Sequence, residues 1–190
     1  KEAGAEEIVP VLPASVPRAG APALARPGHV EDLKAALAGG KDPVAGIVMG
    51  WGLEPGFVDG RGCFDTLVAL GHLAQTEPLA APVRVLCLTF GACSVLGEPV
   101  RNPDMALPLG PLLALSSEEP RLLFRLVDLS AEDMQAGPQA LAGIARHEAR
   151  SRDKELLCAR RHGRRFHRRY DPVPAPETGG TPLKENGVCL

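Results

Sequence analysis

The sequence has no excess of charge of one sign and no long apolar run. Lys and Arg total 21 against 23 Asp and Glu, a net charge of −2, and this balance argues against a dedicated nucleic-acid-binding protein. No apolar stretch approaches the length that crosses a bilayer, and the acidic start at 1–7 lacks the apolar middle of a signal peptide. We therefore expect a cytoplasmic protein whose partners are neither nucleic acid nor membrane.

The cysteines form no recognisable pattern. There are five, an odd number, and no two are spaced as CxxC, so neither a disulfide framework nor a zinc site is indicated. We expect them to be reduced and mostly buried as small hydrophobic side chains. They are Cys63, Cys87, Cys93, Cys158 and Cys189.

Length and composition predict one globular domain. The chain has 190 residues, of which 45% are apolar and 23% charged, enough for one sizeable core and too few for two. Residues 10–27, PVLPASVPRAGAPALARP, are rich in Pro and Ala and show neither helical nor strand periodicity, which predicts a loop or linker. The compact domain is expected to begin near Gly28.

Beyond Gly28, amphipathic helical segments alternate with short apolar segments typical of strands buried on both faces. Ser130 precedes the last helix and forms a capping-box-like pair with Asp133. This alternation predicts an α/β fold with right-handed crossovers and a parallel sheet covered on both faces. The expected helices are 29–37, 64–75, 103–115 and 131–146, and the expected strands are 44–51, 83–90 and 122–129.

The segment 154–172, KELLCARRHGRRFHRRYDP, has a different pattern. Apolar or aromatic residues alternate with polar ones on both sides of His162 and Gly163. This predicts a β-hairpin with the glycine in the turn.

Two loops invite catalytic or cofactor hypotheses. GWGLEPGFVDG follows a strand, but Gly50 and Gly52 are followed by Pro55 where the third glycine of a dinucleotide-binding loop belongs, which favours a plain surface loop. LTFGACSVLG resembles a nucleophile elbow, which would make the chain a small Cys-dependent α/β hydrolase with Cys93 as the thiol, but Val95 stands where the second glycine is needed. His72 or His147 could act as the base, and nothing in the sequence places either near Cys93, so a structural cysteine is favoured.

Two further features concern metals and anions. HEARS at 147–151 lacks the second histidine of a zinc-protease helix and reads as a solvated helix end. A basic run in the hairpin suggests phosphate or nucleic-acid binding, although alternating arginines would equally form an exposed face or pair with neighbouring acids. The run contains Arg160, Arg161, Arg164, Arg165, Arg168 and Arg169, interleaved with His162, Phe166, His167 and Tyr170.

Taken in order, several segments resemble the structural subdomain of the ketoreductase of a modular polyketide synthase. They are DPVAGIVMGWGL, FDTLVALGHLAQ, VRVLCLTFGACSVLGEPVRNPDMALPLGPLLALSSEEPRLLFRLVDLS and ELLCARRHGRRFHRRYDPV. The match covers about Gly28 to Leu190 and depends on the order of the segments, because none of them is a catalytic motif.

The resemblance implies a truncated Rossmann-like parallel sheet with flanking helices plus a C-terminal β-hairpin. In this family such a half binds no cofactor and supports a second half that binds NADPH and carries the catalytic Ser, Tyr, Lys and Asn. NGVCL at 186–190 resembles the first strand of that second half, whose glycine loop would follow Leu190. No catalytic, cofactor-binding or metal-binding residue is therefore assigned to this chain, and no activity is expected of it.

The resemblance also implies partners and boundaries. The partners would be the catalytic subdomain, other domains of the same synthase and, in the parent enzyme, an acyl carrier protein. Residues 1–27 would be a linker or the remnant of a missing first βα unit, 28–172 the structural subdomain, and 173–190 a linker and the first strand of the catalytic subdomain. A sheet that lacks its first unit should expose apolar surface and unpaired backbone groups at that edge.

Overall fold

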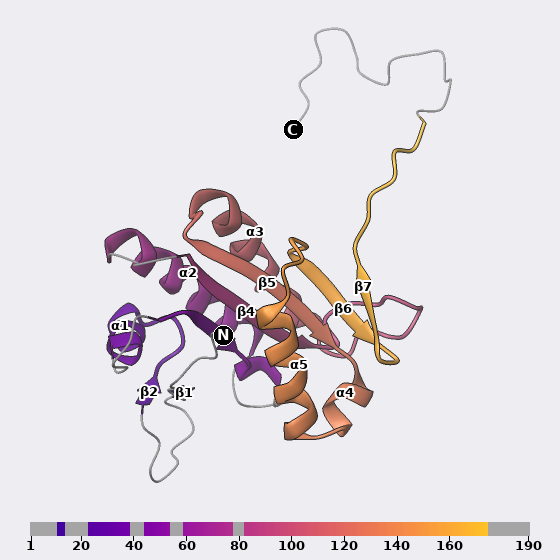
Figure 1. The fold of residues 1–190 in the computed structure, drawn as a ribbon, viewed down its shortest axis with the longest axis horizontal. Coiled ribbons are helices and arrows are strands. Elements are labelled where there is room, and N and C mark those ends of the chain that lie inside the picture. Colours follow the sequence, from indigo (N-terminus) through magenta and orange to yellow (C-terminus); the bar gives the residue numbers. More distant parts are fainter. Residues whose placement is uncertain (1–10, 14–22, 39–43, 54–58, 78–81, 175–190) are drawn as a thin grey trace, which may run out of the picture.

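Strands and helices alternate through most of the chain, as the sequence predicts (Figure 1). The computed structural model describes residues 11–13, 23–38, 44–53, 59–77 and 82–174. The strands are β1 Val11–Pro13, β2 Ala23–Ala25, β3 Gly46–Met49, β4 Val83–Phe90, β5 Leu122–Leu129, β6 Leu157–Arg161 and β7 Arg164–His167. The helices are α1 Val30–Ala38, α2 Gly60–Thr76, α3 Leu109–Glu118, α4 Ala131–Gln135 and α5 Pro138–Arg150, with 3₁₀ turns η1 Trp51–Leu53 and η2 Pro103–Ala106.

The main sheet has five strands in the order β3-β4-β5-β6-β7. The first four are parallel, and β7 runs antiparallel to β6. β4 and β5 have the predicted bounds and align residue for residue, from Val83 beside Leu122 to Phe90 beside Leu129. The predicted α/β fold, a mostly parallel sheet with flanking helices and a C-terminal hairpin, is confirmed.

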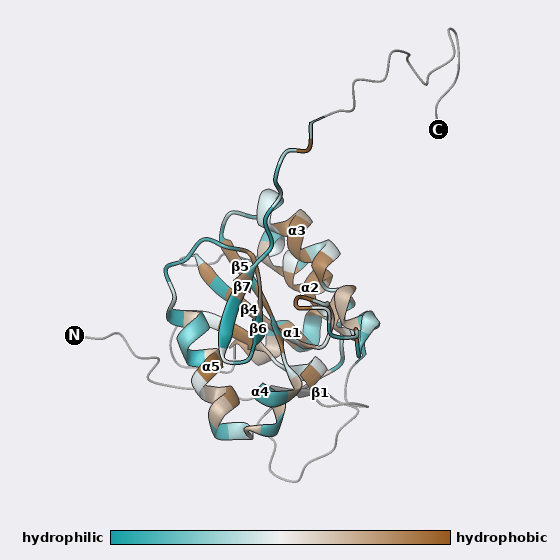
Figure 2. Cartoon of the chain, turned by 90° about the vertical axis from the view of Figure 1, so that its right-hand side faces the viewer, coloured by the Kyte–Doolittle hydropathy of each residue, from teal (hydrophilic) through white to brown (hydrophobic). Residues whose placement is uncertain are grey.

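Helices cover both faces of this sheet (Figure 2). One core lies between the sheet and the helices α2 and α3, and it includes Val85 and Cys87 of β4. The other core lies under α4 and α5, and it includes Leu86 and Leu88. Successive side chains of a strand point to opposite faces, so a strand covered on both sides is a continuous apolar run in the sequence.

β3 is an exception, because it is not buried on both faces as predicted. Within the described residues it pairs with β4 alone and forms the edge of the sheet. Met49 is buried in the α2 and α3 core, whereas Val48 points to the opposite face and is 53% exposed. Local sequence cannot distinguish a central strand from an edge strand, because the difference lies in the neighbours.

Two predicted helices are interrupted by proline. The predicted helix 131–146 is divided into α4 and α5 at Gly137, which has φ +86°, and α5 begins with Pro138. The predicted helix 103–115 is the 3₁₀ turn η2 followed by α3, with Pro108 between them. Proline fits the first turn of a helix and breaks one in its interior, so these positions become starts.

α2 is longer than predicted, and one of its large apolar side chains is exposed. It begins at Gly60 after Asp59, whose carboxylate accepts a hydrogen bond from the Gly62 amide at 2.8 Å. Helical spacing groups Val68 with the apolar side chains that face the core, but it is 47% exposed. Leu67, Leu70 and Leu73 of the same group are buried.

Two short strands lie inside the stretch 10–27, where composition predicts a loop. β1 and β2 pair in parallel as a separate two-stranded sheet. Ala25, at the end of β2, is buried against Leu33, Ala69 and Leu73 of α1 and α2. The loop prediction is therefore wrong at these two strands, while the boundaries 1–27, 28–172 and 173–190 remain predictions.

The predicted hairpin and helix cap are confirmed. Both turn residues have positive φ, +50° at His162 and +69° at Gly163, as in the two-residue turns that match the twist of a hairpin. The Asp133 amide donates to Ser130 Oγ at 3.1 Å, and the Ser130 amide donates to the Asp133 carboxylate at 3.0 Å.

Some sequence predictions lie outside the described residues. These include Pro55, Cys189 and the strand expected at 186–190. In the part of the chain that is described, no helix is both long and apolar enough to cross a bilayer.

Candidate functional site at the carboxyl edge of the sheet

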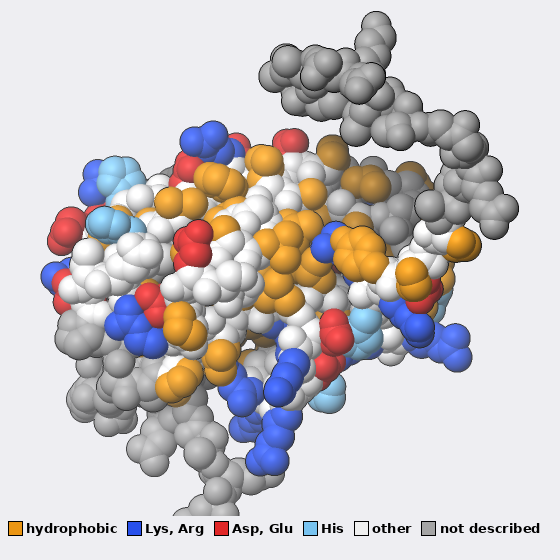
Figure 3. Space-filling model, turned by 90° about the horizontal axis from the view of Figure 1, so that it is seen from above, with side chains coloured by type: hydrophobic (Ala, Val, Ile, Leu, Met, Phe, Trp, Pro, Cys, Tyr) orange, Lys and Arg blue, Asp and Glu red, His pale blue; other side chains and the backbone are white. Residues whose placement is uncertain are grey.

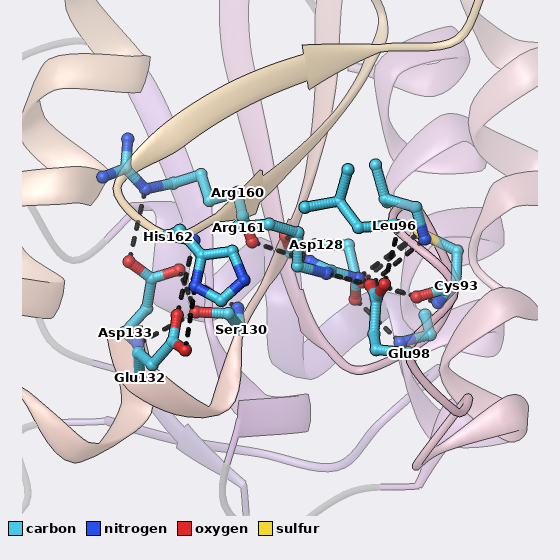
Figure 4. A network of polar contacts seen from close by, with 12 residues as sticks. Cys93, Leu96, Glu98, Asp128, Ser130, Glu132, Asp133, Arg160, Arg161 and His162 are labelled. Atoms are coloured by element: carbon cyan, nitrogen blue, oxygen red, sulfur yellow. Dashed lines mark hydrogen bonds and ion pairs between the residues drawn. The ribbon is translucent and has the colours of Figure 1, made fainter.

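Three polar side chains meet where neighbouring parallel strands end, and Figure 4 labels two of them, Asp128 and Arg161. Thr89 and Asp128 are the next-to-last residues of β4 and β5 and are register partners, and Arg161 is the last residue of β6. The carboxyl ends of parallel strands share one edge of a sheet, and ligands of open α/β sheets bind outside that edge. This makes the cluster the candidate site that the fold itself indicates.

Asp128 is the centre of the cluster. Its side chain accepts hydrogen bonds from Thr89 Oγ1 at 2.9 Å, from the Ala92 amide at 2.8 Å and from Arg161 Nη2 at 2.7 Å. Asp128 is 1% exposed and Arg161 is 5% exposed. A buried carboxylate is stable only when its charge is paired and its lone pairs are used, and both conditions are met here.

Arg161 connects this carboxylate to the loop that follows β4. Its guanidinium donates to the Asp128 carbonyl at 3.1 Å, to the Cys93 carbonyl at 2.7 Å and to the Glu98 carboxylate. A guanidinium has five N–H donors in one plane, which suits it to link several acceptors at once. The arginine thus ties β5, β6 and the loop into one unit.

Glu98 holds the tip of the same loop. It accepts from the Val95 amide at 3.1 Å and from the Leu96 amide at 2.7 Å, as well as from Arg161. These bonds, above all the one from Arg161, lower the pKa of Glu98 to about 2. The loop is therefore closed onto the edge of the sheet by charged groups of the chain itself.

Cys93 lies in this loop, and its surroundings do not activate the thiol. The Sγ atom lies 3.4 Å from the Asp128 carboxylate and 3.8 Å from Arg161 Nη2. Burial, followed by the negative charge of Asp128, raises the pKa of Cys93 to about 11. A nucleophilic cysteine needs a lowered pKa or a base beside it, so the structural role favoured by the sequence is the better reading.

The other cysteines agree with the prediction in the part of the chain that is described. Cys63, Cys87 and Cys158 are free and buried, whereas Cys93 is free and exposed to solvent, although its Sγ atom packs against Asp128 and Arg161. Burial raises the pKa of Cys63 to about 11. These thiols pack as small hydrophobic groups in the two cores of the sheet.

The histidines considered as bases lie elsewhere. His72 is exposed on α2 and lines a shallow hollow of about 410 Å³ between α1 and α2, together with His29 and Val68. His147 is exposed on α5. Within the described residues no group of three or more His, Cys, Asp or Glu side chains could hold a metal ion.

The glycine loop after β3 is described at 50–53 and again from Asp59, and both parts make contacts within the chain. A Cβ atom added to Gly52 would lie 2.6 Å from Met105 Sδ, so this glycine allows the turn η1 to pack closely against η2. The amino end of α2, where a phosphate would bind, carries the carboxylate of Asp59 as its cap. The plain surface loop predicted for this segment stays a prediction at 54–58, which lie outside the described residues.

Most hairpin arginines pair with neighbouring acids, which is one of the alternatives to phosphate binding that the sequence allows. Arg160 lies 3.5 Å from Asp133, and Arg165 contacts Glu148 at 3.2 Å and also Asp153. Arg169 pairs with exposed Asp171, and Arg168 lies over the ring of Tyr170 at 5.0 Å from its centroid. Of the six, Arg164 and Arg168 are the exposed arginines without an ion pair to a described acid. The basic run is therefore mainly a set of internal contacts.

Sequence reasoning missed the acids that organise this site. Asp128 stands inside the apolar strand LLFRLVDL, and a charged residue in a segment expected to be buried is itself a signal that a buried partner exists. Glu98 gives no such signal, because it lies in a loop where charged residues are ordinary. Arg125 in β5 is a second case of the first kind: it is buried and pairs with buried Glu148.

Comparison with known proteins gives a likeness of fold. Neither a protein-family model nor a curated protein matches the chain. A solved structure described as the adenylation, ketoreductase and pseudo Asub multidomain structure of a keto acid-selecting NRPS module matches 75% of this chain with a TM-score of 0.56 and 17% sequence identity. The match spans 13% of that chain. At this identity the similarity shows an α/β fold shared with part of a multidomain protein.

Proposed function

We propose that this chain is the non-catalytic structural half of a polyketide synthase ketoreductase and supports an NADPH-binding half. The observation that carries the proposal is the pairing of charged side chains at the carboxyl ends of β5 and β6. Where an α/β enzyme would bind its ligand, Asp128 and Arg161 neutralise each other, and Glu98 fixes the loop above them. A sheet that only supports a partner has no need of an open crevice there.

The likeness to a ketoreductase-containing multidomain structure supports the same role. The order of segments noted in the sequence points to the same family, and the cap Asp59 places a carboxylate at the helix end where a pyrophosphate would bind. In the intact enzyme, NADPH would supply a hydride to the β-keto group of an acyl chain carried by the acyl carrier protein, and a Tyr hydroxyl of the other half would supply the proton. The proposal assigns no residue of this chain to that reaction.

NADPH titration tests the cofactor part of the proposal. The chain is titrated with NADPH while nicotinamide fluorescence is followed, and it is assayed with a β-ketoacyl thioester. We expect no saturable binding and no ketone reduction. A complete two-half ketoreductase is the positive control, and a stoichiometric titration of this chain would overturn the proposal.

A second experiment tests the supporting role. The chain is co-expressed with the NADPH-binding half of a polyketide synthase ketoreductase, and the two are purified through a tag on that half. We expect co-purification and a higher thermal midpoint for the tagged half, because a partner that binds only folded protein stabilises it. If the tagged half shows the same midpoint with and without this chain, the supporting role is wrong.

A further inference from the structure

One group of positive side chains has no acidic partner within the described residues, in contrast to most arginines of the hairpin. The basic patch consists of Arg84, Arg146, Arg150, Arg152 and Lys154. All five are exposed, and none forms an ion pair with any described acid. In Figure 3, Lys and Arg side chains project together from the lower edge of the molecule. This edge is the side that faces the viewer in Figure 1 and lies at the left in Figure 2, where α5 covers the sheet.

The contacts of Arg84 hold the patch together. This side chain extends from β4 to the carboxyl end of α5, where it donates to the Ala149 carbonyl at 2.8 Å and to the Ser151 carbonyl at 3.2 Å. Its charge is therefore fixed beside the backbone that carries Arg150 and Arg152. Arg146 and Arg150 are four residues apart and so share one side of α5.

The acids of this region do not neutralise the patch. Glu148 is fully buried and faces Arg125 and Arg165, and Asp153 is taken by Arg165. This leaves Glu155 as the exposed unpaired acid in the segment from α5 to β6. The surface therefore keeps a local positive excess although the whole chain has a net charge of −2.

Exposed apolar side chains lie on the same face of the sheet. Leu123 of β5 is the register partner of Arg84 and is 48% exposed. Val48 of edge strand β3 points to the same face, two residues beyond Gly46, which is the register partner of Arg84 on its other side. An apolar centre beside arginines is the composition that protein interfaces favour.

We propose that this face docks the acidic surface of a partner protein domain, with the basic patch in contact with its carboxylates and with Val48 and Leu123 in contact with its apolar side chains. Charge complementarity selects this occupant. Proteins that bind single-stranded nucleic acid stack its bases on aromatic side chains. The patch consists of Lys and Arg, and exposed Tyr170 lies beyond the hairpin, which argues against nucleic acid as the partner. The outer face of α5 exposes Ala142 and Gly143 and not the large apolar side chains of a helix that inserts into lipid.

The inference does not depend on the proposed ketoreductase role, because it concerns a face of the sheet away from the carboxyl edge. The probe for the test is a fluorescein-labelled twenty-residue helical peptide with glutamates along one face and leucines beside them. Its affinity is measured by fluorescence anisotropy for the native chain and for the double variant R150E/R152E. The matched control is R164E/R168E, which reverses the same number of exposed charges on the hairpin.

We expect R150E/R152E to weaken peptide binding by about tenfold or more, because it turns two attractive charge contacts into repulsive ones, and the control to change it by less than about twofold. The affinity of the native chain should also fall with salt. Circular dichroism confirms the fold of each variant, and if R150E/R152E does not fold, amide NMR shifts of the native chain at 146–154 on peptide addition replace it. The proposal would be overturned by an equal loss of peptide affinity in both variants, or by amide shifts that occur only outside 146–154. Tighter binding of the native chain to an oligonucleotide or to phosphatidylserine vesicles than to the peptide would also overturn it.

Discussion

Arg161 and Asp128 form a buried ion pair, with Nη2 of the arginine 2.7 Å from the Asp128 carboxylate, between the ends of two neighbouring parallel strands. The pair lies where other α/β sheets hold a ligand, and it satisfies there the groups that a ligand would otherwise satisfy. Because Arg161 also donates to the Cys93 carbonyl and to the Glu98 carboxylate, the pair explains how the loop after β4 is held at this edge. Its energetic role can be tested directly.

Replacing Asp128 with Asn should destabilise the fold strongly. The variant keeps the shape of the side chain but leaves the buried guanidinium of Arg161 without its full countercharge, a loss typically worth about 3–5 kcal/mol. Urea unfolding followed by circular dichroism measures the change. Asp171→Asn is the control, because its partner Arg169 is exposed and such pairs contribute at most about 1 kcal/mol. If the two substitutions cost the same, the buried pair does not stabilise this edge.

The contribution of Glu98 should disappear in acid. Its pKa in the folded chain is about 2, below its ordinary value of 4.5, so the stabilisation is complete above about pH 4.5 and is lost as the pH falls toward 2. The free energy of unfolding of Glu98→Gln should thus be lower than that of the native chain at pH 6 and should converge with it near pH 2. A difference that stays constant over this range would contradict the assignment.

Cys93 should react slowly with iodoacetamide. With a pKa of about 11, its thiolate fraction at pH 7.5 is far below that of a free cysteine, whose pKa is about 8.5. We expect alkylation at least about tenfold slower than that of glutathione, allowing for the higher intrinsic reactivity of a more basic thiolate. Peptide mass spectrometry locates the label, and Asp128→Asn, if folded, should speed the reaction. Fast labelling of Cys93 in the native chain would restore the hydrolase hypothesis.

The same substitution should have opposite effects at two glycines. Gly163 has φ +69° in the hairpin turn, so Gly163→Ala should destabilise the chain by about 1 kcal/mol. Gly143 lies in α5 with no atom within 4 Å of an added Cβ, so Gly143→Ala should stabilise it by up to about 1 kcal/mol. Thermal unfolding of both variants measures the signs. Two changes of the same sign would show that the backbone account of one position is wrong.

Much of the fold could be predicted because its signals are local. The strands β4 and β5 have the predicted bounds because a parallel strand covered on both faces is a continuous apolar run. The hairpin followed from alternation and a glycine, and the cap from Ser130 and Asp133. The errors at Pro108 and Pro138 were also local, since proline marks a helix start that the apolar periodicity hides.

The candidate site was harder to predict, because its partners are far apart in the sequence. Asp128 and Arg161 are separated by 33 residues, and Cys93 and Arg161 by 68. A charged residue in an apolar strand announces that a partner is needed but does not say which one. The same limit applied to β3, whose apolar run is that of a central strand although Val48 is exposed at the edge.

The sequence by itself determined the alternation of strands and helices, the position of the hairpin turn and the lack of any catalytic pattern, because these depend on the spacing of apolar residues and on the backbone preferences of a few glycines, prolines and caps. Only the tertiary structure decided which arginines are neutralised and which remain free. Pairing depends on the distance between groups that the sheet brings together. The sheet buries Arg161 against Asp128, and it leaves Arg84, Arg150 and Arg152 exposed without an ion pair to any described acid.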